Sequence, residues 1–342
     1  MTKKIISLTL IALLLFSLLS CGQAAPDTPE KTPEKALKIG VLSGTTGMGA
    51  AKMIEDLNKA PSEKYESIKI YSDPSAIMSD MISKNIDIAA MPTNAAATLY
   101  NKSKGGVKVI ALNTLGVLYL LDNTGEINSL SDLSGKTIHV ATPGQTPEYI
   151  LKNVLNKAGI TDVTFSTEYT DMDTLASKLA AGKNADGEYF VKIALLPEPK
   201  VTVALNQAKA NGNANLKVAI DLTAEWDKLE ENPVTQGCVV VQKDVLEQFP
   251  ASVDAFLADY EKSIVFITNT ENLDAAANTI ANVGIIPKAP IAKMALPKCN
   301  IVYVDGEKMK ATLEDFLKTL YEMDKTAIGG ALPDEEFYYI PQ

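Results

Sequence analysis

Apolar and polar residues follow one another along the chain in a unit that is used repeatedly. A short apolar run rich in β-branched residues ends in small polar residues and continues as a segment with apolar residues at helical spacing. These runs are LKIGVL (37–42), IDIAAM (86–91), KTIHVA (136–141) and VKIALL (191–196). Further β-rich runs, SIKIYS, VKVIAL, VTFSTEY and KVAIDL, lie between them. This alternation of strands and helices predicts an α/β protein with mainly parallel sheets.

The turns after these runs carry candidate binding chemistry. In an open parallel sheet, the loops after the carboxyl ends of the strands meet at one edge, and the helices leaving them point free N–H groups there. Any one turn residue could be only a turn former or a helix cap. The same chemistry at successive junctions favours a polar ligand cleft. The residues are Gly44, Thr45, Thr46, Gly47, Gly49, Thr93, Asn94, Gly144, Gln145 and Thr146.

The N-terminal residues predict export and a lipid anchor. Lys3 and Lys4 precede an apolar run that is short for a membrane span and ends in Leu-Leu-Ser-Cys-Gly, which resembles the bacterial lipobox. We expect a signal peptide over 1–20 and a lipidated Cys21; a plain cleaved signal with an incidental cysteine is the alternative. Residues 21–36 are rich in proline and lack large apolar side chains, so we expect a disordered tether.

The length of the remaining chain predicts two lobes. About 300 residues follow the tether, which is more than one hydrophobic core usually holds. Two apolar stretches, LGVLYLLDN and QGCVVVQKDVL, could connect the lobes. We expect lobe 1 over 37–115 plus 241–342, lobe 2 over 116–240, and two hinge strands near 115–122 and 236–243.

The charge balance restricts the partners. The chain has 32 basic and 42 acidic residues, so nucleic acid and anionic lipid surfaces are poor partners. Every basic residue is a lysine, and arginine, the usual bidentate ligand of sulfonate or phosphate, does not occur in the sequence. An anion would have to be held by backbone amides, hydroxyls and lysines.

Few residues could bind a metal or a cofactor. His139 is the sole histidine of the sequence, so it lacks the clustered ligands of a zinc or copper site, and we expect neither a metal nor a cofactor. Cys238 and Cys299 could form a disulfide outside the cytoplasm or remain two buried free thiols.

The order of the segments resembles a known family. After the lipobox come LKIGVLSGTTGMGAAKM, IDIAAMPTNAAATLYNK, INSLSDLSGKTIHVATPGQTPEYILKNVL, LLPEPKV, FPASVDAFLADYEKSI and AIGGALPDEEFYY. This order is similar to that of the solute-binding lipoproteins of bacterial ABC importers, in the branch for nitrate, sulfonates, taurine and thiamine precursors, over residues 37–339. The resemblance implies the two-lobed type II periplasmic-binding fold and a monomer anchored outside the cytoplasm on the bacterial cell membrane. It also implies capture of a small solute between closing lobes and delivery to a permease driven by an ATPase.

The resemblance further implies which residues face the solute. They are Ser43, Gly44, Thr45, Thr46, Gly47, Met48, Thr93, Asn94 and Thr114 from lobe 1, and Gly144, Gln145, Thr146, Pro147, Tyr149 and Glu198 from lobe 2. Glu198 could instead be a solvated acid at a strand end. Tyr149 could pack between helix and sheet rather than stack on a planar solute. Trp226 is expected to anchor packing.

Two ligand classes and two other functions stay open. Without arginine, a neutral or weakly charged organic solute, such as a heteroaromatic thiamine precursor, is favoured over a sulfonate or nitrate. The same fold serves menaquinone-pathway dehydratases, pyrimidine-forming enzymes and receptors for membrane sensors. The sequence has neither a nucleophile elbow nor an HExxH helix, and a packed, hydrogen-bonded role is the commoner one for a histidine placed like His139. We therefore expect a binding protein and not an enzyme.

Overall fold

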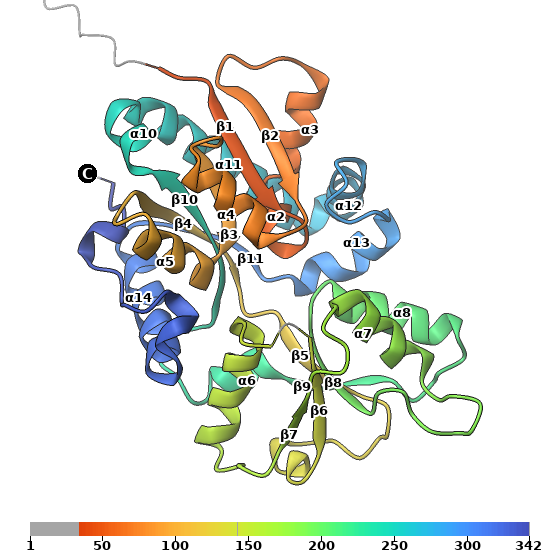
Figure 1. The fold of residues 1–342 in the computed structure, drawn as a ribbon. Helices are drawn as coiled ribbons and strands as arrows, with labels where there is room; N and C mark the ends of the chain where they lie inside the picture. The colour runs from red at the N-terminus through yellow and green to blue at the C-terminus, as the bar shows by residue number, and fades with distance from the viewer. Residues whose placement is uncertain (1–33, 142, 342) are drawn as a thin grey trace, which may run out of the picture. The chain divides into compact units, whose positions relative to one another are not determined.

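Two β-sheets organise the part of the chain that the computed structural model describes, residues 34–141 and 143–341 (Figure 1). The first sheet has the strand order β11-β4-β10-β3-β1-β2, and the second has the order β7-β6-β8-β5-β9. Helices alternate with strands through most of this part, which confirms the α/β class. The predicted signal peptide, Cys21 and the tether up to Pro33 lie outside the described residues.

In the first sheet, the strands that come early in the chain share one direction. β1 (Leu37–Leu42) pairs in parallel with β2 (Tyr65–Tyr71) and with β3 (Ile88–Pro92). β4 (Val107–Leu115) has the same direction but is separated from β3 by β10 (Thr235–Gln242), which is antiparallel to both.

The second sheet repeats this arrangement on a smaller scale. β6 (Thr137–Val140) pairs in parallel with β7 (Thr164–Ser166) and with β8 (Ile193–Pro197). β5 (Leu118–Asp122) lies between β8 and β9 (Lys217–Asp221) and is antiparallel to both. In each sheet most strands are parallel, as the sequence predicts. The antiparallel strands include β10 in the first sheet and β5 in the second, and both adjoin the segments where the chain passes from one sheet to the other.

The helices begin where the sequence offers a cap. The aspartates before α4, α7 and α9 accept hydrogen bonds from first-turn amides. The remaining bounds are β11 (Ile301–Val304), α2 (Thr45–Met48), α3 (Ala51–Lys59), α4 (Pro74–Ile82), α5 (Thr93–Lys102), η1 (Leu130–Leu133), α6 (Thr146–Lys157), α7 (Met172–Ala181), α8 (Lys200–Ala210), α9 (Leu222–Trp226), α10 (Lys243–Gln248), α11 (Pro250–Thr268), η2 (Thr270–Asn272), α12 (Leu273–Asn282), α13 (Ala289–Ala295), η3 (Leu296–Lys298), α14 (Gly306–Met323), η4 (Lys325–Ile328) and η5 (Glu335–Phe337).

The chain crosses between the sheets twice. The first crossing is the short step Gly116–Val117 between β4 and β5. The return leads from β9 through α9 to β10, which pairs with β4 from Thr235 onward. Residues 235–240 were expected in lobe 2, but their backbone hydrogen bonds to β3 and β4 place them in the first sheet.

Helices cover both faces of each sheet (Figure 1). In the first sheet, α3 and α10 to α13 pack on one face, and α4, α5 and α14 pack on the other. In the second sheet, α7 and α8 pack on one face, and α6 and α9 on the other. The apolar cluster formed by α4, α5, α14, α6 and α9 is continuous, so one core joins the two sheets.

Two sequence expectations about single residues are settled by this core. Trp226 is 1% exposed and its ring centroid lies 5.7 Å from that of Phe316 on α14, which confirms that it anchors packing. Cys238 and Cys299 are free, buried thiols, so the possible disulfide is not formed. Cys238 belongs to the apolar cluster on one face of the first sheet and Cys299 to the cluster on the other face, so the sheet itself separates them.

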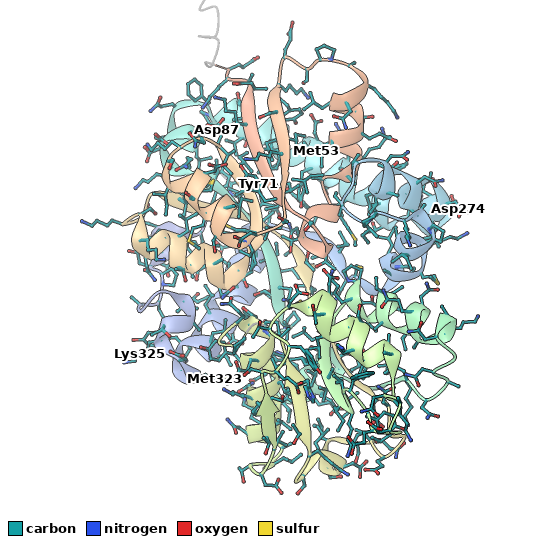
Figure 2. All side chains as sticks on the ribbon, turned by 45° about the vertical axis from the view of Figure 1, so that its right-hand side comes forward. Met53, Tyr71, Asp87, Asp274, Met323 and Lys325 are labelled. Atoms are coloured by element: carbon teal, nitrogen blue, oxygen red, sulfur yellow. The ribbon has the colours of Figure 1, made fainter. Side chains whose placement is uncertain are left out.

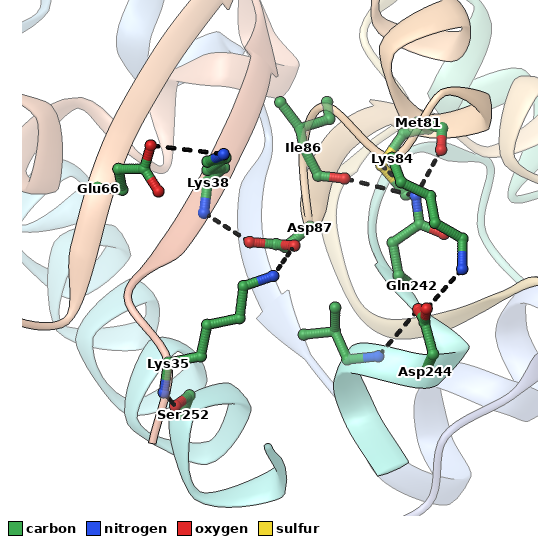
Figure 3. A network of polar contacts seen from close by, with 11 residues as sticks. Lys35, Lys38, Glu66, Met81, Lys84, Ile86, Asp87, Gln242, Asp244 and Ser252 are labelled. Atoms are coloured by element: carbon green, nitrogen blue, oxygen red, sulfur yellow. Dashed lines mark hydrogen bonds and ion pairs between the residues drawn. The ribbon is translucent and has the colours of Figure 1, made fainter. Parts of the chain in front are cut away.

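A buried carboxylate holds the amino-terminal end of the first sheet (Figure 3). Asp87 is 4% exposed and accepts hydrogen bonds from Lys35 Nζ at 2.5 Å and from the Lys38 N–H at 2.9 Å. In Figure 2 Asp87 lies at this end, whereas Met323 and Lys325 lie toward the second sheet. Among the described helices, none has both the length and the apolar character that a membrane span requires.

Candidate functional site

The carboxyl ends of β1, β3 and β4 meet the start of β10 along one edge of the first sheet. The register aligns Gly237 of β10 with Pro92 at the end of β3 and with Thr114 near the end of β4. Thr46 follows β1 in α2, and Thr93 begins α5 directly after β3. Three of the predicted residues, Thr46, Thr93 and Thr114, therefore lie on what we name the first edge, together with the start of β10.

Asn113, for which the sequence pattern held no signal, ties the first edge together. Its side chain is buried, and Nδ2 donates to the Thr46 carbonyl at 3.1 Å and to the Tyr260 hydroxyl at 2.9 Å. Its Oδ1 accepts a hydrogen bond from the Thr114 hydroxyl at 3.1 Å. A Cβ atom on Gly237 would lie 2.5 Å from this Oδ1, so glycine is needed there. Asn113 thus fixes the turn after β1 against the ends of β4 and β10.

The second sheet presents its own edge beside the crossing. The loops after β6 and β8 lie there with Gly144 and Glu198, together with Thr223 in the first turn of α9, which directly follows β9. The Glu198 N–H donates to the Val117 carbonyl at 2.9 Å. A Cβ atom on Gly116 would lie 2.4 Å from Thr223 Oγ1. The crossing therefore brings Glu198 and Thr223 of this second edge next to the end of β4.

Glu198 is buried, which contradicts the alternative of a solvated acid at a strand end. It is 2% exposed, and its carboxylate accepts hydrogen bonds from the Thr202 hydroxyl at 3.0 Å and from the Thr202 N–H at 3.2 Å. Burial raises the pKa of Glu198, because desolvation outweighs these hydrogen bonds and the charge of Lys298. No lysine makes an ion pair with Glu198 among the described residues. The second edge therefore carries a carboxylate whose charge has little compensation.

Buried polar atoms without hydrogen-bond partners gather on the two edges. Within the described residues, four of the six such atoms lie there. Thr146 Oγ1 and Thr223 Oγ1 are on the second edge, and Thr235 Oγ1 and Gln236 Oε1 are at the start of β10 on the first. A buried polar group without a partner costs about 1–3 kcal/mol, and in a native protein such a group needs an explanation. A bound polar ligand supplies one.

Several predicted site residues already have partners within the fold. Met48 is fully buried in the apolar cluster on one face of the first sheet, so its side chain packs in the core instead of facing the first edge. Asn94 donates to the Ala327 carbonyl at 3.4 Å, and the Tyr149 hydroxyl donates to Asp324 Oδ2 at 2.6 Å. Tyr149 is 8% exposed and belongs to the core, which agrees with the packing alternative.

The turn residues around these positions differ in exposure. Gly144 has a φ of 74°, a conformation that favours glycine, and its N–H donates to Glu148 Oε2 at 2.5 Å. Ser43, Gly144 and Gln145 are exposed, Gly44 is half-buried, and Thr45, Gly47 and Pro147 are buried.

His139 is packed, but it is not hydrogen-bonded as expected. Its Nδ1 has no partner among the described residues, and its Nε2 lies 3.9 Å from Glu168 Oε2, which is too far for a hydrogen bond. In the part of the chain that the structure describes, no group of three or more His, Cys, Asp or Glu side chains is placed to hold a metal ion.

The fold is that of the type II periplasmic binding proteins. An ABC transporter protein from Parabacteroides distasonis superposes with a TM-score of 0.72 at 22% identity, over 90% of this chain and 99% of that one. The aliphatic sulphonate binding protein SsuA from Escherichia coli gives 0.68 at 16% identity, over 91% and 93% of the two chains. The nitrate-binding protein NrtA from Synechocystis gives 0.57 at 11% identity, over 85% and 82%.

Within this class, residues 105–272 match the model of the family described as NMT1/THI5 like. The matched segment contains β4, the second sheet, both crossings and β10, so it includes the second edge and the part of the first edge formed by β4 and β10. The match agrees with the branch that the sequence resembles. No curated protein matches the chain in sequence.

Proposed function

We propose that the chain is the solute-binding protein of an ABC importer and captures its solute between the first and second edges. The observation that carries this proposal is the set of buried, unpartnered polar side chains on both edges. A solute that bonds to both sheets would favour the arrangement in which the edges are close, because a ligand shifts a conformational equilibrium by its differential affinity. Solute-binding neighbours with the same fold support this mechanism.

The chemistry of the edges supports a neutral or cationic solute with N–H groups. Glu198 and the amide oxygen of Gln236 accept hydrogen bonds, and the threonine hydroxyls both donate and accept. The sequence contains no arginine, so a sulfonate lacks its usual bidentate partner. A heteroaromatic compound such as a pyrimidine precursor of thiamine fits this chemistry, and a sulfonate or nitrate is the second candidate because the neighbours SsuA and NrtA bind these anions.

The proposal includes the location and the partners. A chain lipidated at Cys21 and joined by the tether 21–36 would work as a monomer outside the cytoplasm and hand its solute to a permease with its ATPase. This geometry suits capture better than catalysis, so we propose a binding protein and not an enzyme of the same fold. Conversion of a bound pyrimidine by the purified protein would contradict this.

The identity of the solute can be measured directly. Mass spectrometry of small molecules released from natively purified protein should name it, and calorimetric titration with pyrimidines, alkyl sulfonates and nitrate should rank the classes. We expect the pyrimidines to bind more tightly. Tighter binding of a sulfonate would overturn the proposed class, and failure of every solute to bind would overturn the function.

Threonine-to-valine variants test the site itself. Thr146→Val and Thr223→Val each remove an unpartnered buried hydroxyl from the second edge and keep the side-chain shape. We expect each variant to weaken solute binding roughly two- to tenfold without lowering the free energy of unfolding, because the lost hydroxyl bonds only to solute. Ser263→Ala is the matched control, since it removes an equally unpartnered hydroxyl from α11, which contributes no residue to either edge. Equal loss of affinity in the control would contradict the site.

A further inference from the structure

A segment near the C-terminus forms hydrogen bonds with the first turns of α5, which packs on the first sheet, and of α6, which packs on the second. This segment, residues 324–331, comprises η4 and its flanking residues, and we name it the C-terminal strap. Three of its backbone carbonyls accept hydrogen bonds from the side-chain amides of Asn94 and Asn101 on α5. Its first residue, Asp324, accepts the hydrogen bond from the Tyr149 hydroxyl on α6 at 2.6 Å.

The strap is firmly attached to α5. A Cβ atom on Gly329 would lie 2.9 Å from Thr98 Cα, so the two backbones are in close contact. Beyond the strap, the Tyr100 hydroxyl on α5 donates to Asp334. Asp324 is itself held in place, because its Oδ1 accepts hydrogen bonds from the Thr326 N–H at 2.8 Å and from the Thr326 hydroxyl at 2.7 Å. Only Oδ2 of this carboxylate is left for Tyr149.

These contacts connect the two edges of the candidate site. α5 begins at Thr93 on the first edge, and α6 begins at Thr146 on the second. Tyr149 follows Thr146 by about one helical turn, so a shift of the Tyr149 ring moves the unpartnered Thr146 hydroxyl with it. The hydrogen bond between Tyr149 and Asp324 is therefore set where it can fix the separation of Thr93 and Thr146.

We propose that Asp324, acting through Tyr149, is a positioning residue for the solute site and holds the first turn of α6 in place relative to the first edge. This inference rests on the proposed function. Asp324 does not contact the solute in this arrangement. It reduces the conformational freedom of the first turn of α6, so that the solute loses less binding free energy in ordering that turn.

Tyr149→Phe tests the proposal, because it removes one hydroxyl and keeps the ring in the core. We expect solute affinity to fall roughly three- to tenfold, mainly through faster dissociation. Tyr100→Phe is the matched control, since it removes the same kind of tyrosine–aspartate hydrogen bond from the same C-terminal region but leaves α6 untouched. We expect its affinity to equal that of the wild type.

A double-mutant cycle separates the bond from other effects of the two residues. If Asp324 acts through Tyr149, Asp324→Asn in the Tyr149→Phe background should produce no further loss of affinity. Losses that add would show that Asp324 acts by another route and would overturn the proposal. Unchanged affinity in Tyr149→Phe, or an equal loss in Tyr100→Phe, would also overturn it.

If the wild type binds no solute, only the proposed function is rejected. Hydrogen exchange then still tests whether the strap holds α6. Tyr149→Phe should increase amide exchange both in the first turn of α6 and in the strap, while Tyr100→Phe should leave α6 unchanged. If exchange in α6 is the same in wild type and Tyr149→Phe, the strap does not hold the helix and the proposal is wrong.

Discussion

Two buried asparagines offer a matched test of the candidate site. Asn113 lies on the first edge, whereas Asn123 follows β5 at the end of the second sheet that is opposite to the second edge. Both are at most 1% exposed, and each side chain takes part in three hydrogen bonds. We predict that alanine at either position destabilises the fold to a similar degree, and that only Asn113→Ala weakens solute binding.

The magnitude follows from the hydrogen bonds that are lost. One intramolecular hydrogen bond contributes about 0.5–1.5 kcal/mol net, so three contribute roughly 1.5–4.5 kcal/mol, and buried partners left unsatisfied move the cost toward the upper value. We expect both variants to lose roughly 3–4.5 kcal/mol of unfolding free energy. Asn113→Ala also releases the Thr46 turn and the Thr114 hydroxyl, which lie on the first edge. If one of these groups then loses its hydrogen bond to the solute, the affinity falls roughly fivefold.

Urea denaturation followed by Trp226 fluorescence measures the stability of each variant, and calorimetric titration with the solute measures affinity. The single tryptophan is buried against Phe316, so its emission should report unfolding. If Asn123→Ala weakens binding as much as Asn113→Ala, the loss reflects general destabilisation and not the first edge. If Asn113→Ala folds poorly, the milder Asn113→Ser supplies the comparison, and wild-type affinity in that variant would refute the role of Asn113.

Three further outcomes are expected. Asp87→Asn should lower the unfolding free energy by about 2–3 kcal/mol because it removes the buried, charged acceptor of the hydrogen bonds from the half-buried Lys35 and from the Lys38 N–H. Asp244→Asn, at a more exposed ion pair, should cost less than about 1 kcal/mol in the same urea titration. Burial raises the folded-state pKa of Glu198 above its ordinary value of 4.5. As the pH rises from 4.5 through the raised pKa, the unfolding free energy of the wild type should therefore fall relative to that of Glu198→Gln. A difference in unfolding free energy that does not vary with pH would contradict this. Gly237→Ala should lower the unfolding free energy by about 1–3 kcal/mol and weaken solute binding, because its Cβ would lie 2.5 Å from Asn113 Oδ1. An unchanged thermal unfolding midpoint and an unchanged affinity would show that the first edge relaxes around the added methyl group.

The fold could be predicted because its signal is local. The run LKIGVL and the helical spacing of the segment that begins TPEYILKNVL belong to β1 and α6 in the structure. The position of β10 was harder to predict, because QGCVVV is apolar and would suit either sheet. Strand pairing with β3 and β4, far away in sequence, decides the assignment, and apolar periodicity carries no information about it.

The candidate site could be predicted only in part for the same reason. Thr46, Thr93 and Thr114 lie on the first edge because they end or follow parallel strands, which the sequence indicates. Asn113 owes its role to partners 67 and 147 residues away, and Tyr149 owes its packing to Asp324, 175 residues away. Residue type and local spacing contain no trace of these contacts, so a ligand role and a structural role could not be separated.

The two asparagines make this limit concrete. Asn113 ends the apolar stretch VKVIALN and Asn123 ends LYLLDN, so residue type and local pattern treat them alike. They differ because β4 shares the direction of β1 and β3 and therefore ends at the first edge, whereas β5 is antiparallel to β8 and ends away from the second edge. Strand direction, which is set by pairing between distant segments, thus decides which of two similar residues can support a ligand. Comparing their alanine variants tests this argument as well as the site.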